Sequence, residues 1–226
     1  MMQIFKNRKE AGKILAEKLR EYAGRSDVLV LGLPRGGVPV AYEVARALSA
    51  PLDVLIVRKL GVPGQEELGF GAIAADGEIV LNENLVRALH ITREMVRRIV
   101  DRETEELNRR DVLYRGGRPF PRVEDKLVIV VDDGLATGST MRAAIEMLRT
   151  KRAGQIVVAV PVGSRDTCEK LDGADALCIC ATTPEPFYGV GMWYEDFSQT
   201  QDDEVRRLLY EAGTFSDRGK RSVAAK

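Results

Sequence analysis

Two adjacent carboxylates, Asp132 and Asp133, are the side chains of this sequence best suited to chemistry. They follow the apolar run Val128–Val131, which predicts a buried strand. After them come small and hydroxyl-bearing residues, 134–140, which predict a turn that opens a helix. Paired acids can accept hydrogen bonds from a sugar diol, and backbone amides at a helix N-terminus can bind a phosphate. The segment therefore suits a ribose 5-phosphate.

Basic residues follow two other predicted strands. Arg35 follows the strand predicted at Val28–Leu33, and Arg58 and Lys59 follow the strand predicted at Leu52–Val57. In open α/β sheets, ligands bind outside the carboxyl ends of the strands. We therefore expect cations and paired acids to meet at one edge of a sheet, an arrangement that suits a sugar lying between two phosphate groups.

The order of apolar runs predicts the fold that must position these side chains. Continuous runs, mostly β-branched, indicate strands buried on both faces, as in a parallel sheet covered by helices. With right-handed crossovers, we expect a doubly wound, mainly parallel α/β sheet flanked by helices. The strands are predicted at Val28–Leu33, Leu52–Val57, Leu127–Val131, Ile156–Val162 and Ala174–Cys180, and the helices at Asn7–Tyr22, Val38–Leu48, Thr140–Lys151 and Asp166–Leu171.

A long excursion, Arg58–Asp125, separates the second and third strands. Its first part is too rich in glycine to form a regular helix. We expect a short strand at Glu78–Leu81 after it, and then helices at Glu83–Leu89 and Thr92–Val112. The excursion thus resembles a loop followed by a small helical appendage.

The chain is long enough for one medium domain. We expect that domain over residues 1–213, with a core at about 27–183 and a small C-terminal hood at about 184–213. The hood would end in a helix at Asp202–Ala212, and the N-terminal helix could contribute to it. The polar residues 214–226 are expected to form a disordered tail.

Charge and hydropathy exclude several classes of function. The 34 basic residues balance 34 acidic ones, so no global field attracts nucleic acid or an anionic membrane. The N-terminus lacks the apolar core of a signal peptide, and no run of about 18 apolar residues predicts a membrane span. Cys178 and Cys180 are expected to share one strand face as small hydrophobic residues of a reduced, cytoplasmic protein. The only histidine, His90, is expected to be structural or solvated.

Two familiar phosphate-binding motifs do not fit. A P-loop needs four residues between its glycines and a following Lys, whereas Gly134 and Gly138 enclose three residues and no Lys follows. A dinucleotide fingerprint needs three glycines at the start of the first helix, and the spacing of Gly32, Gly36 and Gly37 is wrong for it. The site must therefore be of another kind.

The segment Val128–Thr140 closely resembles the phosphoribosyl-pyrophosphate (PRPP) signature of type I phosphoribosyltransferases, and the resemblance extends over about residues 27–183. It implies a catalytic role for Lys59, Asp132 and Asp133, with the two acids on the ribose hydroxyls. It also implies a mobile catalytic loop at Leu60–Ala75. The PRPP-binding residues that it implies are Arg35, Gly36, Gly37, Arg58, Lys59, Asp132, Asp133, Ala136, Thr137, Gly138, Ser139 and Thr140. Mg²⁺ would enter with PRPP, held mainly by the ligand and water, with Asp132 as a partner through water and no direct protein ligand.

The acceptor is harder to predict. Phe187, Trp193 and Tyr194 lie where the family keeps its base-binding hood and could stack on a planar compound, although core packing explains them nearly as well. Ala136 stands where 6-oxopurine enzymes typically carry an Asp, which argues against a hypoxanthine- or guanine-type enzyme.

The resemblance implies transfer of the 5-phosphoribosyl group of Mg-PRPP to an acceptor nitrogen, of a nucleobase-like compound, with release of pyrophosphate. One alternative is a PRPP- or nucleotide-sensing regulator of the same fold that binds nucleic acid without catalysis. Two others are a phosphosugar-binding module with a degenerate loop and a diphosphate-synthesising enzyme that uses ATP. Self-association stays open.

An Arg-rich helix is the only support for the regulator. Its charges are spaced for i,i+4 ion pairs, which favours a solvated helix and argues against a nucleic-acid surface. The expected pairs are Glu94 with Arg98, Glu105 with Arg109, and Glu106 with Arg110.

Overall fold

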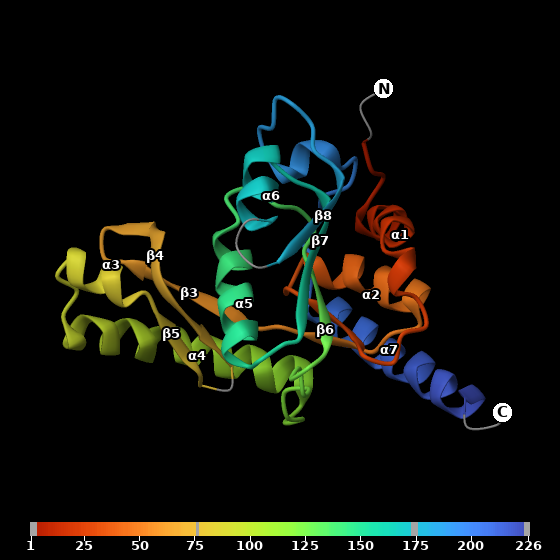
Figure 1. Ribbon diagram of the computed structural model, residues 1–226, viewed down its shortest axis with the longest axis horizontal. Coiled ribbons are helices and arrows are strands. Elements are labelled where there is room, and N and C mark those ends of the chain that lie inside the picture. The colour runs from red at the N-terminus through yellow and green to blue at the C-terminus, as the bar shows by residue number, and fades with distance from the viewer. Residues whose placement is uncertain (1–3, 76, 173–175, 224–226) are drawn as a thin grey trace.

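The computed structural model describes residues 4–75, 77–172 and 176–223, without the side chains of 66, 67 and 214–223. Its centre is a five-stranded sheet in the order β2-β1-β6-β7-β8 (Figure 1). All four neighbouring pairs in this sheet are parallel. The strands are β1 (Val28–Gly32), β2 (Leu52–Val54), β6 (Leu127–Val131), β7 (Gln155–Val162) and β8 (Leu177–Thr182). The predicted parallel α/β sheet is confirmed.

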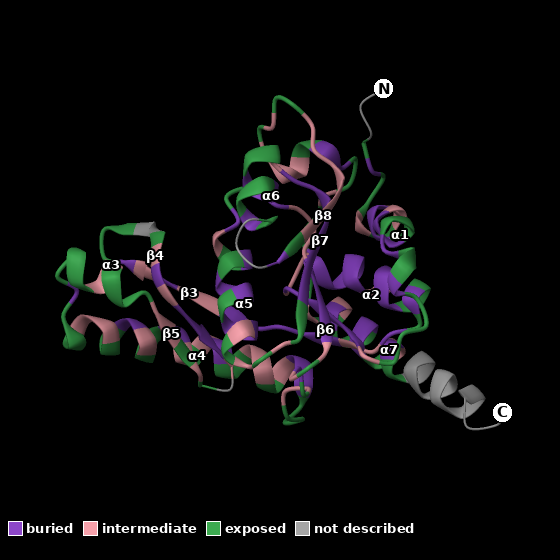
Figure 2. Ribbon diagram, in the orientation of Figure 1, coloured by how far each residue is buried: buried purple, intermediate pink, exposed green. Residues whose placement is uncertain are grey.

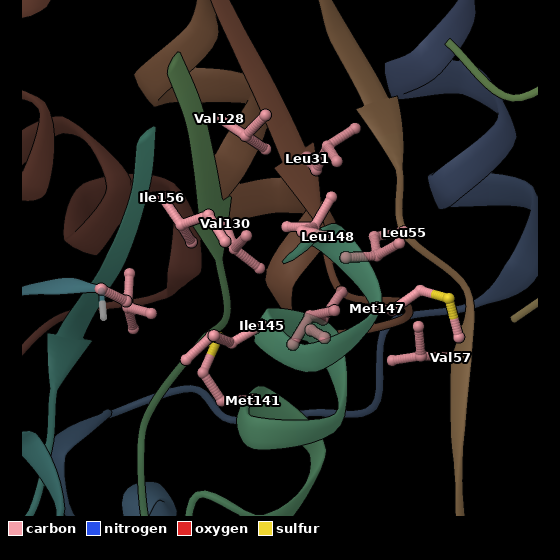
Figure 3. Packing of buried hydrophobic residues seen from close by; sticks show 14 of the residues in the cluster. Leu31, Leu55, Val57, Val128, Val130, Met141, Ile145, Met147, Leu148 and Ile156 are labelled. Carbon is pink, nitrogen blue, oxygen red and sulfur yellow. The ribbon is translucent and has the colours of Figure 1, made fainter. Parts of the chain in front are cut away.

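Helices cover both faces of this sheet, because the strands are apolar on both sides. Side chains such as Val28 and Val30 of β1 pack against α1 (Arg8–Lys18) and α2 (Gly37–Leu48). The alternate positions, such as Leu31, pack against α5 (Ser139–Thr150) and α6 (Arg165–Asp172). Figure 3 shows this second layer, in which Val128, Val130 and Leu31 face Met141, Ile145 and Leu148. Buried residues accordingly concentrate on the central strands and the inner faces of α2 and α5 (Figure 2).

The glycine-rich part of the excursion is a β-hairpin rather than an irregular loop, whereas a catalytic role for Leu60–Ala75 stays a prediction. β3 (Val57–Val62) and β4 (Gln65–Ala74) pair antiparallel, and β5 (Ile79–Leu81) adds a third strand. The predicted strand Leu52–Val57 is likewise divided, because β2 ends at Val54 and β3 starts at Val57.

Close packing explains the glycines of the hairpin. A Cβ on Gly71 would lie 2.5 Å from the carbonyl oxygen of Val80, and one on Gly69 would lie 2.8 Å from Cγ of Lys59. The buried Leu60 and Phe70 pack with apolar residues of α4 (Arg93–Arg115). Glycines that resemble loop residues in the sequence therefore serve a packed strand, and α5 lies between this small sheet and the parallel one (Figure 1).

The remaining elements close the domain. α3 (Glu83–Ala88) precedes α4, and the short helices η1 (Arg20–Tyr22) and η2 (Val190–Trp193) lie in the N-terminal and hood segments. α7 (Asp202–Val223) starts where predicted but continues past Ala212, through most of the segment expected to be a disordered tail; residues 224–226 of that tail lie outside the described residues. Every helix among the described residues is too short or too polar to cross a membrane.

Candidate functional site

The acid pair lies at the carboxyl end of the central strand β6, against the turn that follows β1. β1 and β6 are parallel neighbours, so their carboxyl ends meet. A Cβ on Gly36 would overlap the carboxylate of Asp133, and one on Gly37 would lie 2.6 Å from the carbonyl oxygen of Val131. Only glycine allows this approach, which explains why two glycines stand here. The Pro34–Arg35 peptide bond within the turn is cis.

Arg8 compensates one of the two acids. Its Nε and Nη2 atoms each lie 2.8 Å from Oδ2 of Asp133, and its Nη1 donates to the carbonyl oxygen of Ser198 at 2.7 Å. The guanidinium also lies over the ring of Phe197, 4.1 Å from the ring centroid. Sequence reasoning missed Arg8, because it lies 125 residues from its partner and stands in an ordinary helix start capped by Asn7.

Burial and the nearby charges shift the pKa values of Asp132 and Asp133. Burial raises the pKa of Asp132 well above its ordinary value, and the nearby charge of Asp133 raises it further. Burial also raises the pKa of Asp133, against the opposing influence of Arg8. Both carboxylates are thus costly to keep ionised, and donors such as sugar hydroxyls would relieve that cost.

The loop 134–140 presents an open helix N-terminus beside the acids. Within the described residues, no side chain caps α5, whose N-cap is Gly138 at φ +71°, and its first turn carries no acid. The unpaired amides and the helix dipole favour an anion at such a position. Two contacts support the loop from behind: the hydroxyl of Thr167 donates to the carbonyl oxygen of Ala136 at 2.7 Å, and Arg142 Nη2 donates to that of Thr137 at 2.9 Å.

A basic cavity of about 430 Å³ lies on the other side of the turn after β1. Its charged side chains come from β3 and from α4, and Thr140 of α5 lines it as well. Its cations outnumber its one acid, Glu103, which makes it suitable for an anion of high charge. The lining residues are Pro34, Val57, Arg58, Lys59, Gly61, Arg102, Glu103, Arg110 and Thr140.

Three of the cations that line this cavity pair with acids. Arg58 donates to Glu103 from Nε at 2.7 Å, and Nη2 of Arg102 lies 3.0 Å from the same carboxylate. Arg110 pairs with Glu106 at 2.6 Å, and Arg109 pairs with the same carboxylate. Together, and mainly through Arg109, the two arginines lower the pKa of Glu106 to about 2.

Helix α4 forms most of the predicted ion pairs and also contributes side chains to the cavity, which the sequence did not predict. The pairs Glu94–Arg98 and Glu106–Arg110 are confirmed, whereas Arg109 contacts Glu106 rather than Glu105. Arg102 and Arg110 also line the cavity, which no local pattern indicated. Only the packing of α4 against the hairpin brings them there.

Two groups of predicted residues have other contacts. Nη1 of Arg35 lies 3.7 Å from Asp202 at the start of α7. Trp193 and Tyr194 are buried, with 7% and 6% of their surface exposed, in a cluster against which Phe187 packs. The hydroxyl of Tyr194 donates to the carbonyl oxygen of Asp133 at 2.6 Å. The burial of these rings favours the packing role that the sequence left open, and Tyr194 supports the acid pair from the hood side.

Comparison with known proteins agrees with this geometry. Residues 2–191 match the family model of the phosphoribosyl transferase domain. Proteins from two strains of Mycobacterium tuberculosis, each named "Putative phosphoribosyl transferase", are 44% identical over 225 residues, which are 99% of this chain and 51% of theirs. The chain thus spans about half the length of these curated relatives.

Two further matches are a more distant relative and a solved structure. The bifunctional protein PyrR of Alkaliphilus metalliredigens is 30% identical over 141 residues, 60% of this chain and 71% of PyrR. The crystal structure of TT1426 from Thermus thermophilus aligns with a TM-score of 0.85 at 40% identity, covering 92% of this chain and 99% of that one. Sequence, fold and site geometry agree, and the chain belongs to the phosphoribosyl transferase family.

Proposed function

We propose that this domain binds Mg-PRPP and transfers its 5-phosphoribosyl group to a nitrogen atom of a small planar acceptor, with release of pyrophosphate. The observation that carries the proposal is the convergence of three features at one edge of the sheet. These are the acid pair 132–133, the uncapped N-terminus of α5 and the basic cavity. They match, in order, a ribose diol, a 5-phosphate and a pyrophosphate.

Each part of PRPP has a partner in this proposal. The amides and hydroxyls of Thr137–Thr140 bind the 5-phosphate, since a helix N-terminus favours an anion. Asp132 and Asp133 accept hydrogen bonds from the ribose hydroxyls. Arg58 and Lys59 meet the pyrophosphate, together with Arg102 and Arg110 from α4.

The residues present also fit a magnesium ion carried in by the ligand. Asp132 is a half-buried carboxylate with a raised pKa that accepts a hydrogen bond from the amide of Asp133, and a nearby cation would stabilise its charge further. Mg²⁺ commonly keeps several waters and binds through substrate phosphates, so Asp132 can interact through water. Bound in this way, Mg²⁺ would neutralise charge on the departing pyrophosphate.

The reaction requires positioning and charge stabilisation rather than covalent catalysis. The bond from ribose C1 to the pyrophosphate oxygen breaks, the acceptor nitrogen forms the new bond to C1, and the proton of that nitrogen is released. The ribose ring gains positive charge on the way, and the two carboxylates beside the diol stabilise it. Arg8 holds Asp133 in place, with Nε 2.8 Å from its carboxylate, and so acts as a positioning residue.

The acceptor class is a planar, nitrogen-containing compound of nucleobase type. Residue 136 of the loop is Ala, where 6-oxopurine enzymes typically carry an Asp beside the base. The missing carboxylate argues against hypoxanthine and guanine as acceptors. The buried Trp193 and Tyr194 shape the hood rather than offering open rings to a ligand.

Titration calorimetry with Mg-PRPP tests the site. Replacing Asp132 and Asp133 together by Asn should weaken binding by at least about a hundredfold, because hydrogen bonds to charged groups contribute about 1.5–3 kcal/mol each. Circular dichroism should show an intact fold, since Asn carries no buried charge. Asp203→Asn, at an exposed acid on α7, is the control and should bind normally. Unchanged affinity in the double variant would reject the site.

Pyrophosphate release over a panel of nucleobases tests the reaction. The wild-type chain should release pyrophosphate with at least one planar base, and the double Asn variant should not. Binding of Mg-PRPP without release for any base would reject transfer and leave a binding module.

A further inference from the structure

All three cysteines of the chain meet at one place in the fold, between α6 and β8. Cys168 lies on α6, and Cys178 and Cys180 lie on β8. The three Sγ atoms lie within 4.8 Å of one another, and those of Cys178 and Cys180 are 3.9 Å apart. The sulfur of Cys168 is paired with that of Cys180 in a disulfide, which corrects the expectation of three reduced cysteines. Cys178 is the free member of the group.

The arrangement follows from strand alternation and helix packing. Residues two apart on a strand share one face, so Cys178 and Cys180 both point to the face on which α6 packs. This part of the sequence prediction is confirmed. The third sulfur joins them because Cys168 occupies the face of α6 turned toward β8, a meeting that cysteine spacing did not indicate.

The backbone is spaced more widely than a disulfide usually needs. The Cα atoms of Cys168 and Cys180 are 7.4 Å apart, whereas disulfides usually have Cα atoms about 4.4–6.8 Å apart. A metal ion with thiolate bonds of about 2.3 Å separates its sulfurs by roughly 3.8–4.0 Å. That span matches the 3.9 Å between Cys178 and Cys180 and suits the wide spacing of the other pair.

The surroundings select the class of a bridging ion. A Cβ on Gly163 would lie 2.9 Å from the sulfur of Cys168 and 3.2 Å from that of Cys180, so glycine keeps this side clear. The group contains sulfur ligands alone among the described residues. Thiolate-only sites select soft ions such as Cu(I) and Zn²⁺ over Mg²⁺ or Ca²⁺.

We propose that, in the reduced protein, Cys168, Cys178 and Cys180 form a three-thiolate site for a thiophilic d¹⁰ cation, Cu(I) or Zn²⁺. The site lies behind the phosphate loop, because Thr167, which holds the carbonyl of Ala136, precedes Cys168 on α6. The amide of Gly163 also donates to the carbonyl oxygen of Thr182 at 3.2 Å, which joins the loop side to β8. The site is independent of the proposed transferase chemistry.

Loading the site requires reduction and deprotonation. A dithiol such as dithiothreitol gives two electrons and two protons to the Cys168–Cys180 disulfide and is itself oxidised to a cyclic disulfide. Each of the three thiols then loses one proton when the cation binds. Binding should therefore strengthen as the pH rises.

Metal titration of the reduced, desalted chain without oxygen tests the proposal. We expect one equivalent of Zn²⁺ or Cu(I) to be retained against a competing chelator, with the two ions in separate arms to show which is preferred. Alkylation followed by mass spectrometry should find all three cysteines protected in the loaded wild-type chain and all three reactive without metal. This readout needs no variant, so a folding defect cannot obscure it.

Variants then separate the site from a simple disulfide. Cys178→Ser should weaken metal binding by about tenfold or more, since one of three ligands is lost. It should still form the Cys168–Cys180 disulfide on reoxidation. Retention of less than one equivalent by the wild-type chain, incomplete protection on loading, or equal affinity in Cys178→Ser would overturn the proposal.

Discussion

The two sides of the candidate site consist of different chemical groups, backbone amides on one side and charged side chains on the other. The loop side, 134–140, presents backbone amides at the start of α5, and Thr167 and Arg142 hold its carbonyls in place. The cation side presents long side chains from β3 and α4, several of which already have acid partners, such as Arg58 with Glu103. One side is therefore held by hydrogen bonds from behind, whereas the other consists of charged side chains that are already paired with acids.

This difference predicts how the two sides respond to change. Rigid backbone sites fail when their shape is altered, because no rearrangement is available to them. Sites made of paired side chains respond to charge instead, since each partner competes with the ligand. Arg8 combines the two properties. It is a charged side chain, and it holds Asp133 in position beside the closely packed glycine turn.

Among single substitutions, the largest effect should come from Gly36→Ala. The new methyl group would overlap the carboxylate of Asp133 and lie 3.2 Å from Nε of Arg8. Because overpacking costs about 1–3 kcal/mol, we expect Mg-PRPP to bind about thirtyfold more weakly, measured by calorimetry. Gly213→Ala is the matched control, with nothing within 4 Å of its new Cβ, and should bind normally. Equal affinities in the two variants would contradict the close approach of turn and acids.

A smaller loss is expected for Arg8→Gln. The charge of Arg8 lowers the pKa of Asp133 against the effect of burial, so the variant should hold Asp133 protonated to higher pH. Arg8 acts on the ligand only through Asp133, so we expect about tenfold weaker Mg-PRPP binding near neutral pH, a change of about 1.4 kcal/mol. The acid limb of the binding profile should also move to higher pH. Lys9→Gln, at the exposed neighbouring residue, is the control and should leave the pH profile of binding unchanged. An unchanged pH profile in Arg8→Gln would show that the charge of Arg8 does not influence Asp133.

Stability should depend on pH through Asp132. Its pKa is raised in the folded chain, so the folded state favours the protonated acid. The contribution of this group to stability is complete below its ordinary pKa of 3.8 and is lost as the pH rises through the folded value. Asp132→Asn mimics the neutral acid, so its free energy of unfolding should exceed that of the wild type increasingly as pH rises. Urea unfolding between pH 4 and pH 8 measures this, and a constant difference would refute the raised pKa.

The smallest effect should come from Glu103→Gln on the cation side. Glu103 is 7% exposed and holds Arg58 and Arg102, so its neutralisation frees positive charge in the cavity. We expect Mg-pyrophosphate to bind about threefold more tightly, a change of about 0.7 kcal/mol. Glu94→Gln, in an exposed pair on the same helix, should change nothing. Weaker binding in Glu103→Gln would mean that the acid orients the arginines rather than competing for them.

The parallel sheet could be predicted because its signals are local. Continuous apolar runs such as 127–131 indicate strands buried on both faces, and adjacent helical patterns supply the covers. The hairpin could not be predicted in this way, because Gly69 and Gly71 resemble loop residues unless the side chain of Lys59 and the backbone of Val80 are known to lie against them.

The sequence by itself determined the acid pair, the glycine turn and the loop 134–140, because each lies within a few residues of the strand that positions it. Only the tertiary structure decided the rest. Arg8 reaches Asp133 across 125 positions, α4 brings Arg102 and Arg110 to the cavity, and α6 brings Cys168 to two cysteines on β8. The physical reason is that local spacing sets which face of an element a side chain occupies, whereas the packing of whole elements sets which faces meet.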